Sequence, residues 1–444
     1  MTATVSVTAQ KRAFDEIDDD RTLKHRRVGN VPNLQHQLLL HKKAQPFELH
    51  RAGDVPVAKP GEVLIEIQAV GLNPIDWKSA LYGFAIPAFP CISGREFAGT
   101  VVYANGKNDS GIVVGDRVLS IATDYRDFRK SAFQQYAVST AFNAVKIPRH
   151  VDLAHTTSLG VAFVAAALAL GVCLGVNFAG PVTERSLLKT AQNQDPETLP
   201  KDVRDEVLNA ISPSHTPYAG DWILIYGASS ITGQICIQLC KLSNLRVIAV
   251  ANESRHGERL RALGADLIVD REDLDKAATQ IRESVPGSLR FAIDCVGKET
   301  AAWCQDLLAG QSALPAAELR RRSEDRGSDP SNQGYLMCHL VGLTGLPKEQ
   351  AASVRQHQVP IKLFHENHAL GREMSSWLTE LLGQGLLQLP EVELLKGGLG
   401  SINAGLDRLK SGALSGKRLV VELDHMLESK LAVWPPEDGG FCWC

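Results

Sequence analysis

A short glycine-rich segment constrains the fold more strongly than any other part of the sequence. It begins at Gly227 and ends at Gly233; the apolar run Trp222–Tyr226 precedes it, and apolar residues with helical spacing follow it. This order of strand, turn and helix is typical of a dinucleotide-binding turn, in which small residues let backbone N–H groups approach a pyrophosphate. The spacing is Gly-x-x-Ser-x-x-Gly, which departs from the strict Gly-x-Gly-x-x-Gly pattern. The residues expected to contact the cofactor here are Gly227, Ala228, Ser229, Ser230, Ile231, Thr232 and Gly233.

Strand and helix patterns alternate around this turn. Further apolar strands are predicted at 245–250, 265–270, 290–297 and 335–343, with a helix at 256–264. Alternation of this kind is the mark of an α/β fold with a parallel, doubly wound sheet of the Rossmann type.

The end of the second strand of this unit indicates which nicotinamide cofactor is bound. An NAD site places Asp or Glu there, whereas this strand ends at 251–252 with Ala and Asn. Ser254 and Arg255, with Arg259 as a further candidate, would hold a 2′-phosphate, so we predict NADPH. If the Glu253 side chain points inward, it would favour NADH over NADPH. Alternatively, Arg255 and Arg259 do not bind the cofactor and simply belong to a solvated helix face.

Residues 34 to about 150 have a different pattern. Val63, Ile65 and Ile67 alternate with Glu66 and Gln68, and several other short alternating runs are separated by glycine-marked turns. Many short strands in succession predict a small β-barrel.

Charge and cysteine usage exclude several classes of protein. The 47 Lys and Arg nearly balance 50 Asp and Glu, and aromatic residues make up only 6%, so we expect no nucleic-acid partner. Nine cysteines without a Cys-x-x-Cys pair indicate free thiols in a reducing compartment. The apolar stretch 159–174 is predicted to be a buried helix too short to span a bilayer, and no secretory signal is expected. We therefore predict a cytoplasmic protein without a membrane partner.

Four segments lie outside the two predicted folding units. They are a disordered tail at 1–33, polar surface insertions at 180–217 and 311–333 that need not be ordered, and a loose tail at 424–444. Basic clusters in the first tail resemble a bipartite nuclear import signal, with a plain solvated tail as the alternative.

Motifs in both halves of the chain resemble the medium-chain dehydrogenase/reductase family. The first half carries "VGLNPIDWK", "SGREFAGTVV" and "GDRV", and the second carries "YGASSITGQICIQLCK", "LGAD" and "DCVG". The resemblance implies a GroES-like β-barrel substrate domain built from 34–160 and 346–423. It also implies a Rossmann NADP-binding domain at 161–345 and a cleft between the two that holds the nicotinamide.

The zinc-containing branch of that family is contradicted by two residues. Asn73 and Arg95 stand at positions where that branch has a Cys and a His ligand, and amide and guanidinium groups are not zinc ligands. The segment between Gly99 and Gly115 contains no cysteine, so the structural zinc lobe is also missing. We therefore expect no metal.

The zinc-free branch includes quinone oxidoreductases and enoyl reductases. "NPIDWK" with "YGASSITG" most resembles the fungal trans-acting enoyl reductases of polyketide pathways, in which Ser or Thr replaces the middle glycine, as Ser230 does here. The resemblance implies NADPH-dependent reduction of an enoyl thioester, a small-molecule or carrier-bound acyl substrate, a polyketide synthase as partner, and a monomeric chain.

Catalytic candidates follow from the same resemblance. Lys78 would hydrogen-bond the substrate carbonyl or the cofactor ribose, Tyr82 is a candidate proton donor, and Asn73 would shape the cleft. Backbone groups expected beneath the nicotinamide belong to Val341, Gly342, Leu343 and Thr344. Two alternatives stay open: an NADPH:quinone oxidoreductase, and a non-catalytic NADPH-binding scaffold or nuclear redox sensor.

Overall fold

The structure is a computed structural model that describes residues 31–423, apart from 107, 180–183, 286–288 and 311–336. The predicted insertion at 311–333, the tail at 424–444 and the basic clusters of the N-terminal tail lie outside the described residues.

Six strands form a wholly parallel sheet in the order β12-β11-β10-β13-β14-β15. Their bounds are β10 Trp222–Tyr226, β11 Arg246–Ala251, β12 Leu267–Asp270, β13 Phe291–Asp294, β14 Cys338–Gly342 and β15 Val354–Gln358. The sequence predicted all but β15, an edge strand whose largely polar residues lack the apolar run of a buried strand. The strand order reverses between β10 and β13, which places a crevice at their carboxyl ends.

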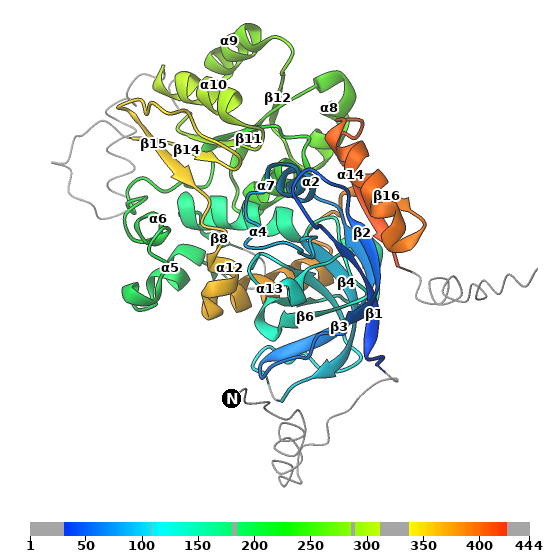
Figure 1. Ribbon diagram of the computed structural model, residues 1–444. Helices are drawn as coiled ribbons and strands as arrows, with labels where there is room; N and C mark the ends of the chain where they lie inside the picture. Colours follow the sequence, from blue (N-terminus) through cyan, green and yellow to red (C-terminus); the bar gives the residue numbers. More distant parts are fainter. Residues whose placement is uncertain (1–30, 107, 180–183, 286–288, 311–336, 424–444) are drawn as a thin grey trace, which may run out of the picture.

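Helices cover both faces of this sheet (Figure 1). On one face Ile223 and Ile225 share a core with α4 and α7, and on the other Leu224 and Tyr226 share a core with α9 and α10. The bounds are α4 Gly160–Leu168, α7 Ile231–Leu242, α8 Glu253–Ala262, α9 Leu274–Ser284 and α10 Lys298–Ala309. Because successive residues of β10 enter opposite cores, both faces are buried, which explains the continuous apolar run of this strand.

A second sheet of seven strands forms the barrel-like part, with a separate pair, β1 (Leu34–Leu39) and β2 (Glu48–Asp54), beside it. Its central strand β3 pairs with β4, β6 and β17. The bounds are β3 Glu62–Gly71, β4 Glu96–Ala104, β5 Arg117–Ile121, β6 Tyr136–Thr140, β7 Ala144–Lys146, β16 Glu391–Leu395 and β17 Lys417–Glu422. Ile65, Phe97 and Val421 share its core.

The C-terminal part of the chain returns to this second sheet. Strand β17 pairs antiparallel with β3, and α14 (Ile402–Lys410) packs against α2 (Pro74–Tyr82). Figure 1 shows the orange α14 and β16 beside the blue N-terminal strands. The fold is therefore a GroES-like barrel that the chain completes after it has made the Rossmann sheet.

The structure adds detail to two expectations about the middle of the chain. The described part of the 180–217 insertion is ordered: it forms α5 (Leu187–Gln192) and α6 (Arg204–Leu208), because Leu187, Ala191 and Val207 are buried in the core. The helical run Leu153–Cys173 is longer than the predicted stretch and reaches membrane-spanning length and hydropathy. However, 89% of its most apolar window is buried inside the protein, so it packs as a core helix.

Candidate active site

The glycine-rich turn joins β10 to α7 at the crevice of the parallel sheet. Gly227 has φ +74°, and a Cβ on Gly233 would lie 2.6 Å from the Gly227 carbonyl oxygen, so both positions require glycine. The Ser230 hydroxyl accepts a 3.0 Å hydrogen bond from the Gly233 N–H and caps the helix. The N–H groups of Ile231 and Thr232 in the first helical turn have no partner within the helix, which fits an anionic pyrophosphate at this N-terminus.

Two backbone N–H groups of the turn already donate hydrogen bonds within the protein. The N–H groups of Gly227 and Ala228 both donate to the Val250 carbonyl oxygen, at 3.1 and 3.2 Å. These two residues therefore shape the turn, and the amides that remain for a ligand belong to residues later in the turn.

A cavity of about 280 Å³ opens beside the turn. It is lined by Tyr226, Gly227, Ser229, Val250, Ala251, Arg271, Glu272, Val296 and Thr300. These residues lie at the carboxyl ends of β10, β11, β12 and β13, where open α/β sheets bind ligands. The residues present thus fit a dinucleotide: a close-packed helix N-terminus would face its pyrophosphate, and a cavity lies next to this turn.

The residues proposed to bind the 2′-phosphate have different surroundings in the structure. Asn252 caps α8 by accepting hydrogen bonds from the Ser254 hydroxyl (2.9 Å) and the Arg255 N–H (3.0 Å), while the Arg255 side chain is exposed. Arg259 instead donates to Gln234 and to the Leu389 carbonyl, so it links helices to the return segment. Glu253 is ion-paired with Arg261.

Arg271 was not predicted, although it lines the cavity. It follows β12 directly, and its N–H donates to the Ala251 carbonyl at the end of β11. The sequence offered one sign that Arg271 could bind a ligand: it is a charged residue directly after the predicted strand at 265–270.

The expected nicotinamide strand ends near the crevice. Val341 and Gly342 are buried in β14, and the Leu343 N–H donates to the Asp294 carbonyl oxygen at 2.9 Å. Thr344 is exposed, and its hydroxyl oxygen would be 4.0 Å from a Cβ on Gly297. The structure therefore places all four residues at the carboxyl edge of the sheet.

Asn73 lies in a buried polar network between the two sheets. Its side-chain amide donates to Glu96 Oε1 at 2.8 Å, and Glu96 Oε2 accepts the Val161 N–H at 2.7 Å. The Arg418 guanidinium of β17 lies 3.7 Å from the same carboxylate. Burial raises the pKa of Glu96, and Arg418 opposes that shift.

The donor set does not fit zinc. The Asn73 amide is bonded to Glu96, and Arg95 presents a guanidinium group, which carries no lone pair for a metal. Among the described residues no group of three or more His, Cys, Asp or Glu side chains is arranged to hold a metal ion.

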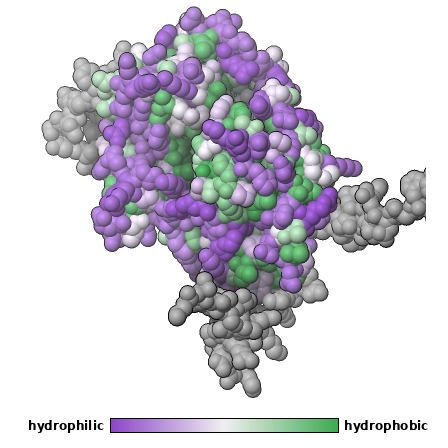
Figure 2. Space-filling model, in the orientation of Figure 1, coloured by the Kyte–Doolittle hydropathy of each residue, from purple (hydrophilic) through white to green (hydrophobic). Residues whose placement is uncertain are grey.

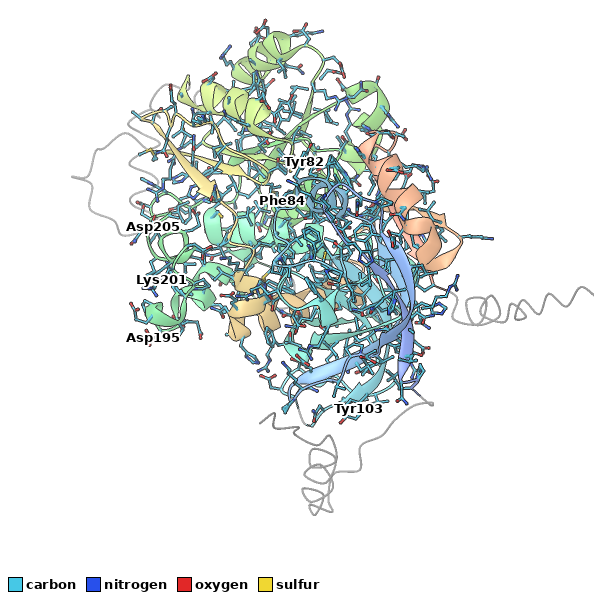
Figure 3. All side chains as sticks on the ribbon, in the orientation of Figure 1. Tyr82, Phe84, Tyr103, Asp195, Lys201 and Asp205 are labelled. Atoms are coloured by element: carbon cyan, nitrogen blue, oxygen red, sulfur yellow. The ribbon has the colours of Figure 1, made fainter. Side chains whose placement is uncertain are left out.

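Lys78 and Tyr82 lie four residues apart on α2 and therefore share one face of the helix. Lys78 Nζ is 5.8 Å from the centre of the Trp77 ring. Tyr82 is 64% exposed with its ring tilted against Trp77, and Figure 3 shows it near Phe84. The structure does not join either residue to the Asn73 network by a hydrogen bond.

Two family matches cover the two halves of this arrangement. Residues 59–149 match the family described as Alcohol dehydrogenase GroES-like domain, and residues 232–311 match Zinc-binding dehydrogenase. The chain belongs to the medium-chain dehydrogenase/reductase family. As a member of this family it is an NAD(P)-dependent oxidoreductase with a nicotinamide cofactor.

Individual relatives extend the similarity over most of the chain. Trans-enoyl reductase BOA5 of Botryotinia fuckeliana is 28% identical over 83% of this chain and 94% of its own length. Trans-enoyl reductase buaC of Petromyces alliaceus is 26% identical over 84% and 93%. A mycobacterial protein solved in complex with NADPH has the same medium-chain dehydrogenase/reductase fold, with a TM-score of 0.61, 17% identity and coverage of 87% and 99%.

Proposed function

We propose that this medium-chain dehydrogenase/reductase is an NADPH-dependent reductase of enoyl thioesters that acts in trans on acyl chains carried by a fungal polyketide synthase. The observation that carries the proposal is the similarity to curated trans-enoyl reductases over more than four fifths of the chain. Non-ligating groups at the two zinc positions, Asn73 and Arg95, also support reduction of an alkene that the thioester already activates. We further propose a cytoplasmic monomer.

The bound nicotinamide supplies a hydride to the β-carbon of the conjugated alkene. The chain must orient the thioester, stabilise the enolate oxygen and exclude water. We propose that Lys78 binds the thioester carbonyl or the cofactor ribose, and that Tyr82 delivers the proton to the α-carbon. Asn73 is held by Glu96 and shapes the wall of the cleft.

Exposed apolar residues support an acyl substrate. Tyr82, Phe84, Phe89 and Val296 are each more than 40% exposed, although large apolar side chains are usually buried. Figure 2 shows hydrophobic surface in the middle of this face, in the region where Figure 1 labels α2. Such a surface is suited to an alkyl chain at the mouth of the cleft.

The function is tested by NADPH oxidation with a panel of enoyl thioesters and quinones. We expect reduction of C4–C8 enoyl N-acetylcysteamine thioesters, and a loss of about 10- to 100-fold in kcat/KM for Lys78→Ala, because a positioned charged donor is removed. Lys410→Ala, at the exposed end of α14, is the matched control. Turnover of quinones without any thioester would favour the quinone reductase, and no turnover at all would favour the scaffold.

Cofactor choice is tested by titration rather than by activity. If Ser254 and Arg255 hold the 2′-phosphate, the double variant Ser254→Ala/Arg255→Ala should weaken NADPH binding by about 10-fold or more and leave NADH binding unchanged, because charge-assisted hydrogen bonds are lost. Arg271→Ala tests the arginine that lines the cavity in the same way. Arg282→Ala, on the exposed face of α9, is the control. Equal losses for both cofactors would contradict the assignment.

A further inference from the structure

Arg95 is a buried arginine without an acceptor. It is only 5% exposed, and its Nε is buried with no hydrogen-bond partner. Within the described part of the chain its guanidinium makes no hydrogen bond and no ion pair within 4 Å. Buried charges are ordinarily paired, because loss of hydration is not otherwise offset. The Asp76 carboxyl group attracts this guanidinium but accepts no hydrogen bond from it, so the donors of Arg95 remain free for an anionic ligand.

The guanidinium is fixed in place on one side by an aromatic ring. Its carbon atom lies 3.8 Å from the centre of the Tyr125 ring, which is the geometry of a cation–π contact. Burial lowers the pKa of Arg95, but an arginine stays protonated at physiological pH. The side chain therefore presents a preorganised positive charge.

Arg95 directly precedes β4 of the barrel, next to a residue that links the barrel to helix α4. The next residue, Glu96, binds Asn73 at the start of α2 and the Val161 N–H in the first turn of α4. Helix α4 packs directly against α7, which begins at the pyrophosphate-binding turn. The Arg95 guanidinium is close enough to Asp76, in the first turn of α2, to lower the pKa of that carboxyl group. Arg95 therefore lies near the helix that carries Lys78 and Tyr82.

We propose that Arg95 is a catalytic residue that donates hydrogen bonds from its guanidinium to the thioester oxygen as this oxygen becomes an enolate. This inference rests on the proposed enoyl reductase function. Hydride addition at the β-carbon moves the alkene electron pair onto the carbonyl oxygen. The enolate then collapses, the α-carbon takes one proton, ultimately from water, and the saturated thioester and oxidised cofactor leave. Arg95 is not itself consumed; it stabilises charge that is present only after hydride transfer.

The neighbouring carboxyl group, Asp76, makes this role pH-dependent. One oxygen of Asp76 accepts the Asn73 N–H at 2.7 Å, and the other has no partner. Burial raises the pKa of Asp76 to about 7, with Arg95 and Arg418 opposing and Glu96 reinforcing that shift. Tyr125 also faces this group, and burial raises its pKa. Below pH 7 Asp76 is neutral and leaves the charge of Arg95 available; above pH 7 its carboxylate partly cancels that charge.

The first test uses Arg95→Met, which keeps the length of the side chain and removes its charge. We expect kcat for crotonyl-N-acetylcysteamine to fall about 100-fold or more with an unchanged affinity for NADPH, and Arg95→Lys to recover part of the loss. Arg126→Met is the control, because Arg126 is the exposed arginine next to Tyr125. The decline of wild-type kcat/KM above pH 7 should disappear in Asp76→Asn.

A second readout does not depend on hydride transfer. Acetoacetyl-N-acetylcysteamine is a β-keto thioester whose enolate absorbs in the near ultraviolet. Wild-type protein should raise the enolate fraction of this compound at pH 7, and Arg95→Met should not. A wild-type protein that reduces enoyl thioesters while Arg95→Met is equally fast and binds the enolate equally well would overturn the role of Arg95. Absence of thioester reduction in the wild-type protein would instead overturn the proposed function.

Discussion

Gly233→Ala should weaken NADPH binding by about 10- to 100-fold, which corresponds to about 1.4 to 2.7 kcal/mol. The new Cβ would lie 2.6 Å from the Gly227 carbonyl oxygen and 2.7 Å from the Ala228 Cα. Both neighbours are backbone atoms of the turn itself, so the contact is relieved only if α7 moves away from the strand. That movement would displace the N–H groups that are proposed to bind the pyrophosphate. The measurement is a titration of NADPH followed by its own fluorescence.

The matched control is Gly400→Ala. A Cβ at Gly400 would have no heavy atom within 4 Å, so the same chemical change should leave cofactor affinity unchanged. The melting temperature of both variants separates a local change in the turn from general destabilisation. If Gly233→Ala bound NADPH within twofold of the wild-type value, the close approach of helix and turn would not be required for binding.

Removing Arg418 or Glu96 should have the largest effect on stability. Arg418 is 5% exposed, donates to the carbonyl groups of Ser158 and Leu72, and is the cation beside the fully buried Glu96. Arg418→Met leaves that carboxylate without its positive partner, at a cost of about 3 to 5 kcal/mol in the free energy of unfolding. The measurement is urea denaturation followed by tryptophan fluorescence.

A double-mutant cycle distinguishes pairing from packing. In Glu96→Gln/Arg418→Met both charges are absent, so we expect the loss to be smaller than the sum of the single losses. Lys417→Met is the control: Lys417 precedes Arg418 on the same strand, but its ion pair with Glu391 is half exposed and should contribute less than about 1 kcal/mol. Additive losses would show that Glu96 and Arg418 act independently.

Local patterns in the sequence were sufficient for the Rossmann part. The turn at 227–233 and the alternation of strands and helices were predicted, because periodicity and turn chemistry involve neighbours in the chain. Edge strand β15 was missed for the same reason: its residues carry no apolar pattern. The four candidate residues at the end of β14 came instead from the family resemblance.

The polar network between the sheets could not be predicted from such patterns. Asn73, Glu96, Val161 and Arg418 lie far apart in the sequence. They meet only when β17 has paired with β3 and α4 has packed against the second sheet. The family resemblance indicated that Asn73 and Arg95 replace zinc ligands. It did not indicate that the Arg95 side chain is buried without a hydrogen-bond acceptor. Likewise, the polar composition of 180–217 concealed the three apolar side chains that hold its helices on the core.

The pairing of β17 with β3 has a consequence for synthesis of the chain. Val420 lies opposite Gly71, so this edge of the barrel stays open until nearly all of the described residues have left the ribosome. The parallel sheet from 222 to 358 is complete by then and does not need β17 as a strand. Because domains fold as their residues emerge, the nucleotide-binding half should become protease-resistant before the half whose first strand is made much earlier. The barrel, whose first strands are synthesised before the parallel sheet, would then be the last part of this protein to finish folding.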